Sequence, residues 1–363
     1  FGSSSNRLRA AGAMGEGDWP APSRIRTVRR GKLEGRTFGE STYTLLEAFS
    51  PEQAQEAPYL LIWLHGQDMG EIPQGDLLTM QQRLQRRTFF LVPLNPKAAE
   101  DGRRFFWGVC YTKAQNKHGL GFIFGKFHTE YLESLTAAIR QISREVGAER
   151  VIVAGYSMGG FGAYQLGAYA PEIFDAVVAV AGYGLGTLEP PDRGFLAPQP
   201  ESATIFAGFL RQQAPRLAAV PVVMAVHAPK DSVSSFCDTA EIVRTVQTSG
   251  GTAELVEVPD EAADSDPSRK KKTPLGHHYF NYALLHDSSD EVLWDRLRAL
   301  FLQVPLRLEL AAPRTPPELR LEAAGPIIRA TGASRSPRRA PLPAGRIAPG
   351  AAGAPGRPWL WTR

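Results

Sequence analysis

The sequence is poor in cysteine and has no long apolar run. Only Cys110 and Cys237 occur among its 363 residues, so a framework of several disulfides is excluded and no short metal-ligand spacing is present. With so few cysteines we expect reduced thiols and an intracellular protein, cytoplasmic or targeted to an organelle. No stretch of about 20 apolar residues occurs, and the sequence therefore predicts no transmembrane segment.

Net charge is low but unevenly distributed. The whole chain carries +4, with eight Arg or Lys against three acidic residues in 1–36 and ten Arg against three Glu in 304–363. Residues 37–303 are therefore acidic, with a balance of −8. Basic ends can attract nucleic acid or anionic membrane, but we expect solvated, disordered tails and no nucleic-acid partner.

Composition divides the chain into three parts. Residues 1–36 are rich in Gly, Ser and Arg and are expected to be disordered. Residues 304–363 are rich in Pro, Ala, Gly and Arg, a composition that cannot build a core, and are expected to form a disordered tail. Between them, residues 37–303 alternate apolar runs with helical stretches, and we expect one globular domain there.

Continuous apolar runs in the middle part are typical of strands that are buried on both faces. Strands are expected at Thr42–Phe49, Tyr59–Leu64, Thr88–Leu94, Arg150–Ala154, Ala176–Ala181, Val220–Val226 and Ala253–Val258. Helices are expected between them, at Gln74–Gln85, Lys126–Val146, Gly159–Ala170, Asp238–Thr248 and Ser288–Leu302. Strands separated by such helices predict an α/β fold with a mostly parallel central sheet and helices on both faces.

One motif carries chemistry. Gly155-Tyr156-Ser157-Met158-Gly159 follows the apolar run Arg150–Ala154 and precedes a helical stretch rich in small residues. In a Gly-x-Ser-x-Gly nucleophile elbow, a sharp strand-to-helix turn strains the serine backbone and lifts its Oγ clear of the sheet. The helix also directs N–H groups and its positive dipole end at the site, where both favour a developing oxyanion. The pattern predicts Ser157 as a nucleophile.

A serine nucleophile needs a base, and an acid orients that base; in this kind of site both follow the serine along the chain. Asp231 lies just past a predicted strand, whereas the alternative acid, Asp238, is expected to begin the next helix. Three histidines follow the acid: His277 and His278 on a late loop, and His286 near a helix start. We predict His277 as the base, with His278 as the alternative and His286 ranked third.

The second half of an oxyanion hole is expected in the loop His65-Gly66-Gln67-Asp68, which follows the second predicted strand. The backbone N–H of Met158, next to the nucleophile, would supply one donor, and that of Gln67 or Asp68 the other. His65 is expected to brace this loop through hydrogen bonds rather than to titrate in catalysis.

Residues 58–300 resemble the esterase and phospholipase/carboxylesterase branch of the α/β-hydrolases. The similarity is tightest in Gly155–Tyr164, which reads GYSMGGFGAY, and it includes Pro221–Asp231. The sequence departs from the family at His227-Ala228, where the family has His-Gly, and in the added polar loop Asp260–Lys272.

The resemblance implies an α/β-hydrolase fold and a serine hydrolase that needs no cofactor or metal. It assigns the triad to Ser157, Asp231 and His277, and the oxyanion hole to the backbone N–H groups of Gln67 and Met158. A small-molecule carboxylic ester is the expected substrate, with thioesters and lysophospholipids as alternatives.

Few features of the sequence indicate which substrate the chain would bind. The aromatic runs Phe105–Trp107 and Phe122–Phe124 could line an acyl pocket or pack in the core, and Leu188–Gln213 could form a cap. Two other hypotheses compete with the hydrolase. One is a catalytically inactive hydrolase-fold binding module, and the other is a nucleic-acid or membrane adaptor that uses the basic ends.

Overall fold

The computed structural model describes most of the chain between residues 23 and 258, together with a short helical segment further on. The described residues are 23–36, 38–66, 72–96, 104–107, 109–116, 119–127, 129–182, 207–208, 210–231, 234–258 and 295–299. The polar loop at 260–272 and the tail at 304–363 lie outside them, so the disorder expected of the tail stays a prediction. Within the described part, no helix combines the length and apolar character that crossing a bilayer requires.

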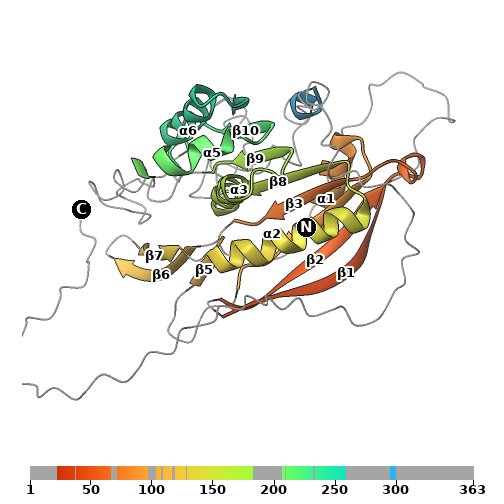
Figure 1. Ribbon diagram of the computed structural model, residues 1–363, viewed down its shortest axis with the longest axis horizontal. Coiled ribbons are helices and arrows are strands. Elements are labelled where there is room, and N and C mark those ends of the chain that lie inside the picture. The colour runs from red at the N-terminus through yellow and green to blue at the C-terminus, as the bar shows by residue number, and fades with distance from the viewer. Residues whose placement is uncertain are drawn as a thin grey trace, which may run out of the picture.

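An eight-stranded sheet forms the centre of the molecule (Figure 1). Its strands, in spatial order, are β1 (Arg24–Gly35), β2 (Gly39–Phe49), β4 (Thr88–Pro93), β3 (Tyr59–Leu64), β8 (Arg150–Tyr156), β9 (Ala176–Val180), β10 (Val222–His227) and β11 (Ala253–Glu257). The β1–β2 and β2–β4 pairs are antiparallel, and the other neighbours are parallel. The order reverses at β3, because β4 is added on one side of it and β8 on the other. Such a switch point leaves a crevice at the carboxyl ends of the strands.

Helices cover both faces of this sheet. Helix α1 (Gln74–Leu84) packs on one face, and α2 (Thr129–Val146), α3 (Met158–Tyr169), α5 (Ala214–Leu217) and α6 (Phe236–Thr248) pack on the other. Every residue of β4, β3, β8, β9 and β10 is consequently buried, which explains their continuous apolar sequences. The arrangement confirms the predicted fold class.

The sheet separates two apolar cores. In β3, Leu60 and Ile62 belong to the core beneath α2 and α3, whereas Leu61 and Trp63 belong to the core that contains α1 and Leu297. Alternate residues fall in opposite cores because successive side chains of a strand point to opposite faces. Leu297 shows that the segment 295–299 covers the same face as α1.

Three strands form a second sheet that the sequence analysis did not predict. The strands β5 (Arg104–Phe106), β6 (Val109–Asn116) and β7 (Gly119–Phe127) pair in antiparallel fashion, and Figure 1 shows them beside the start of α2, apart from the large sheet. Because β7 runs to Phe127, the helix predicted from Lys126 begins at Thr129. Trp107, at the turn between β5 and β6, is fully buried in the core beneath α2 and α3. For Trp107, the last residue of the aromatic run Phe105–Trp107, the structure therefore shows core packing.

The strand β1 corrects the predicted domain boundary. The sequence analysis expects residues 1–36 to be disordered, but β1 occupies the last part of this segment and pairs with β2 from end to end. Its many basic residues hid the strand pattern. Arg26 forms an ion pair with buried Glu47 (2.6 Å), and Leu33 is buried in the core. The ordered domain therefore includes β1.

Candidate active site

Ser157 lies on the sharp turn between β8 and α3. Its backbone has φ 55° and ψ −119°, a conformation that residues with a side chain rarely adopt. Backbone hydrogen bonds hold the turn, from Ser157 N to Val180 O (2.8 Å) and from Phe161 N to Ser157 O (3.0 Å). A strained serine between a strand and a helix is the backbone geometry that a nucleophile elbow requires.

Glycines let this turn pack against the ends of the neighbouring strands. A Cβ at Gly159 would overlap the carbonyl group of Leu64 at the end of β3, and a Cβ at Gly155 would overlap the carbonyl group of Gly159. A Cβ at Gly160 would come within 2.7 Å of the Cα atom of Gly182, which follows β9. The glycines of the motif are therefore required by close backbone contacts on both sides of the turn.

The amino end of α3 lies at Ser157. Met158 is the first residue of the helix and is buried, and Ser157 itself is 8% exposed. The first N–H groups of a helix have no partner within the helix and carry the positive end of its dipole. No acidic side chain occupies the first turn of α3 to compensate this dipole. The turn is thus suited to stabilise negative charge that develops beside the serine.

Asp231 lies in the turn after β10, where the acid is expected. Its side chain is fully buried, and the residual exposure of the residue belongs to its backbone. Its Oδ1 accepts a hydrogen bond from Ser234 N (3.0 Å), and its Oδ2 lies 3.2 Å from Nε2 of buried His227. The alternative acid, Asp238, lies in the first turn of α6, where its N–H donates to the Ser235 hydroxyl (3.2 Å). Burial raises the pKa of the Asp238 carboxyl.

Three predicted parts of the site share one edge of the sheet. Ser157 follows β8, Asp231 follows β10, and the His65-Gly66 loop follows β3. These strands belong to one parallel set, so their carboxyl ends meet at the same edge. The predicted base His277, its two alternatives and Gln67 lie outside the described residues, and their part in the site stays a prediction.

The sheet and the serine turn together decide the fold. Eight mostly parallel strands carry helices on both faces, and a strained serine sits between the fifth strand of the large sheet and the following helix. The chain has the α/β-hydrolase fold.

Several solved structures are similar to this chain. A thermostable esterase is 17% identical, with 76% of this chain and 62% of that one covered and a TM-score of 0.45. An S-formylglutathione hydrolase from Agrobacterium tumefaciens is 15% identical, with 76% and 95% covered and a TM-score of 0.43. A fungal esterase from Rhizomucor miehei is 12% identical, with 78% and 86% covered and a TM-score of 0.47.

No protein-family model and no curated protein sequence matches the chain. The chain spans less than two thirds of the length of the thermostable esterase. The assignment of the α/β-hydrolase fold follows from the sheet and the serine turn.

His65 is held by hydrogen bonds to its own loop and to the segments that contain Asn95 and Trp107. Its Nδ1 lies 2.7 Å from the Gly66 carbonyl oxygen, which can only accept, so Nδ1 carries the hydrogen; Nε2 then accepts a long bond from Asn95 N (3.4 Å). Trp107 donates through Nε1 to His65 O (3.3 Å) and through its backbone N–H to Asn95 Oδ1 (3.1 Å). Burial lowers the pKa of the His65 imidazole, and the Gly66 bond partly opposes this effect.

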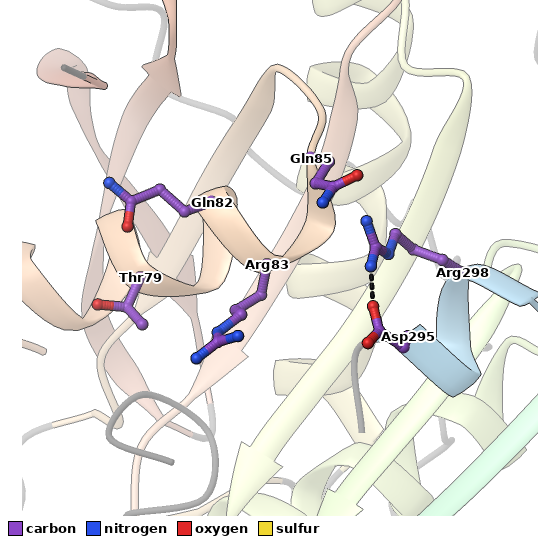
Figure 2. Close-up of a pocket in the computed structure, with 6 residues that line it drawn as sticks. All are labelled: Thr79, Gln82, Arg83, Gln85, Asp295 and Arg298. Carbon is purple, nitrogen blue, oxygen red and sulfur yellow. Dashed lines mark ion pairs between the residues drawn. The ribbon is translucent and has the colours of Figure 1, made fainter. Parts of the chain in front are cut away.

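A separate cleft lies between α1 and the segment 295–299. Figure 2 shows its lining residues, which are Thr79, Gln82, Arg83, Gln85, Asp295 and Arg298, around a cavity of about 270 Å³. Asp295 and Arg298 form an ion pair, and the Thr79 hydroxyl donates to Gly75 O (3.0 Å). Because α1 and α3 pack on opposite faces of the sheet, this polar cleft lies apart from the serine turn. Among the described residues, no group of three or more His, Cys, Asp or Glu could hold a metal ion.

Sequence reasoning missed the side chains of His227 and Thr239, which lie next to Asp231 and next to His227, respectively. His227 is the last residue of β10, and its Nδ1 lies 2.8 Å from the Thr239 hydroxyl in the first part of α6. The sequence signal was a polar residue at the end of an apolar run, four positions before Asp231. It pointed to a buried partner for the acid, whereas the sequence analysis noted His227 only for the alanine that follows it.

Proposed function

We propose that the chain is a serine hydrolase that cleaves carboxylic esters through an acyl-enzyme on Ser157. The observation that carries the proposal is the backbone of Ser157, at φ 55° and ψ −119° on a turn whose glycines are in backbone contact with two neighbouring strand ends. Such strain persists only where the surrounding structure imposes it, and it concentrates at functional sites. Asp231 is the proposed acid, His277 the proposed base, and Gln67 the second oxyanion donor beside Met158.

In the first half of the reaction, His277 accepts the proton of the Ser157 hydroxyl as Oγ forms a bond to the ester carbonyl carbon. The carbonyl electron pair moves onto the oxygen, which faces the backbone N–H groups of Met158 and Gln67. Each such donor lowers the barrier by about 3 kcal/mol. When the tetrahedral intermediate collapses, the bond to the alcohol oxygen breaks and His277 returns the proton to this leaving group.

In the second half, water repeats these steps on the acyl-enzyme. His277 accepts a proton from water, the hydroxide oxygen bonds to the acyl carbon, and Ser157 leaves with the proton from His277. The buried carboxylate of Asp231 holds the imidazole tautomer and stabilises its cationic form. Thioesters and lysophospholipids present the same trigonal acyl carbon, so the same cycle would act on them.

The test uses a fluorophosphonate probe, which labels an activated serine, and nitrophenyl esters of short acyl chains. We expect the parent chain to be labelled and to turn over the esters, and Ser157→Ala to lose labelling and at least about a thousandfold in kcat. Ser143→Ala is the matched control, because Ser143 is a buried serine of α2, away from the turn. This control should retain both labelling and turnover.

The base is tested by His277→Ala and His278→Ala in the same assays. Loss of turnover in the first variant alone supports the proposed triad. If only the second variant loses activity, the base is His278 and the reaction class is unchanged. A folded parent chain that neither labels nor hydrolyses short esters, thioesters or lysophospholipids would contradict the proposed function.

A further inference from the structure

The Asp231 carboxylate is tied to the short turn that ends β9. This turn consists of Val180, Ala181 and Gly182, and we refer to it as the 180–182 turn. On one side of the carboxylate, Oδ1 accepts a hydrogen bond from the Ser234 backbone N–H (3.0 Å). The hydroxyl of the same serine donates to Ala181 O (2.9 Å). Ser234 therefore links one carboxylate oxygen to the turn.

A second link starts at the other carboxylate oxygen. Asp231 Oδ2 lies 3.2 Å from Nε2 of His227, whose ring is fully buried and packs edge-on against Phe236 at 5.9 Å between ring centres. Nδ1 of the same ring lies 2.8 Å from the Thr239 hydroxyl, and this hydroxyl donates to Gly182 O (2.7 Å). His227 and Thr239 thus link Oδ2 to the last residue of the 180–182 turn.

The direction of these hydrogen bonds fixes the hydrogen on Nδ1 of His227. Gly182 O can only accept, so the single hydrogen of the Thr239 hydroxyl is used there, and the hydroxyl oxygen must accept from Nδ1. Nε2 faces a carboxylate oxygen at ion-pair distance, although no well-aligned hydrogen bond reaches it within the described residues. Both side chains are fully buried, so the ring and the carboxylate face each other directly in the interior.

The opposite side of the 180–182 turn contacts the nucleophile. Ser157 N donates to Val180 O (2.8 Å). Gly182 packs closely on Gly160 of α3: a Cβ added to Gly160 would lie 2.7 Å from the Cα atom of Gly182. Ala181 has φ 47° and donates its N–H to the end of β10. One strained turn therefore contacts the serine on one side and the partners of the acid on the other.

We propose that His227 and Thr239 are positioning residues, which set the distance between the Asp231 carboxylate and Ser157 through the 180–182 turn. The inference rests on the proposed function. Both residues are fully buried, and the proposed role requires no contact with the substrate. Without the Thr239 hydroxyl, His227 loses its anchor and the carboxylate shifts with it. The proposed base is then held in the wrong orientation, which slows the chemical steps without changing the binding of the ester.

Thr239→Val tests this role because valine keeps the shape and removes the hydroxyl. We expect kcat for a nitrophenyl ester to fall by roughly 10- to 100-fold, with KM within about twofold of the parent value. Thr239→Ser keeps the hydroxyl and should restore most of kcat. Thr136→Val is the matched control: Thr136 is also buried, and within the described part of the chain its hydroxyl bonds to its own helix alone, at Leu132 O (2.7 Å) and Glu133 O (3.0 Å).

His227 is tested with two amides of different reach. Gln places its amide near the position of Nε2 and offers a donor toward Asp231, whereas Asn places its amide near Nδ1 and keeps only the contact with Thr239. We expect His227→Gln to retain more kcat than His227→Asn. Thermal unfolding of every variant identifies any that fail to fold, and the Thr239 pair decides the question in that case.

The outcomes separate this inference from the proposed function. An active parent chain in which Thr239→Val keeps its kcat, or loses no more than Thr136→Val, overturns the positioning role alone. A rise in KM with kcat unchanged also overturns it, because a positioning defect acts on the chemical steps. A parent chain that neither labels nor turns over overturns the proposed function and the positioning role together.

Discussion

Ser157 shows how a short motif prescribes a backbone conformation. Its positive φ is imposed by the tight turn around it. At Gly155 and Gly159 this turn has no space for a Cβ atom, so both positions require glycine. The motif, the preceding strand and the following helix are all local in sequence, so this part of the site could be predicted. Asp231 could be placed for the same reason, since it needs only the end of an apolar run.

The contacts behind the acid could not be predicted in the same way. His227, at the end of β10, contacts Thr239 of α6 although twelve residues separate them, and the carbonyl group of Gly182, which follows β9, joins them. Spacing along the chain does not specify such a meeting. Two side chains and a backbone carbonyl group, on three segments, must first be brought together by the parallel order of the sheet.

A pH dependence of stability follows from His65. Its pKa is lowered by burial, so the folded chain resists a proton that the unfolded chain accepts as the pH falls below the ordinary value of 6.5. The contribution of His65 to the free energy of unfolding is therefore fully present above that pH. It decreases as the pH falls below that value, until the pKa of the folded state is reached. His65→Asn keeps a donor near Nδ1 and removes the titration.

Urea unfolding at pH 7.5 and pH 5.5 measures this contribution. We expect His65→Asn to lose less stability between the two pH values than the parent chain does. An equal loss in both chains would mean that other groups cause the pH dependence.

At the scale of elements, the β8–α3 junction depends on contacts that a single methyl group would break. Gly159→Ala places a carbon against the Leu64 carbonyl group, and neither backbone segment has a flexible side chain that could yield. We expect a loss of roughly 3 kcal/mol or more in the free energy of unfolding, measured with urea.

Gly75→Ala is the control for this prediction. Gly75 lies in the first turn of α1, and a Cβ there meets no atom within 4 Å. Alanine should stabilise the chain by up to about 1 kcal/mol, because it lowers the entropy of the unfolded state. If both substitutions had similar effects, the packing account of the elbow glycines would be wrong.

Elements with continuous apolar sequences were predicted within a few residues, whereas β1 and the sheet β5–β7 were missed. Continuous runs identify strands buried on both faces without reference to their partners. In β1, by contrast, basic residues become compatible with a strand only through partners such as Glu47, which lies on β2. Patterns that depend on a partner elsewhere in the chain cannot be recognised from one segment.

For the molecule as a whole, β1 closes one edge of the large sheet. Glu47 on β2 is 1% exposed and is paired with both Arg26 of β1 (2.6 Å) and Arg87 (2.6 Å). Removing one partner from a buried ionic group is strongly destabilising, because the remaining charges are left without compensation. The edge strand therefore contributes charge as well as backbone pairing to the stability of the sheet.

Two shortened chains test this contribution. One begins at residue 23 and keeps β1, and the other begins at residue 37 and lacks it. We expect the shorter chain to unfold at a temperature lower by on the order of 10 °C and to aggregate more readily, since β2 becomes an exposed edge. Thermal unfolding and size-exclusion chromatography measure both effects, and equal behaviour of the two chains would contradict them.

The small sheet β5–β7 has a consequence for how this molecule can diversify. It is inserted between β4 and α2 and takes no place in the order of the large sheet. Trp107 fastens it to the domain, against Gly162 of α3 and the carbonyl oxygen of His65. We expect an exchange of the insert that keeps Trp107 to preserve the scaffold of the serine turn. Because the insert takes no place in the order of the large sheet, we expect changes in its length or sequence to leave the strand pairing of that sheet intact.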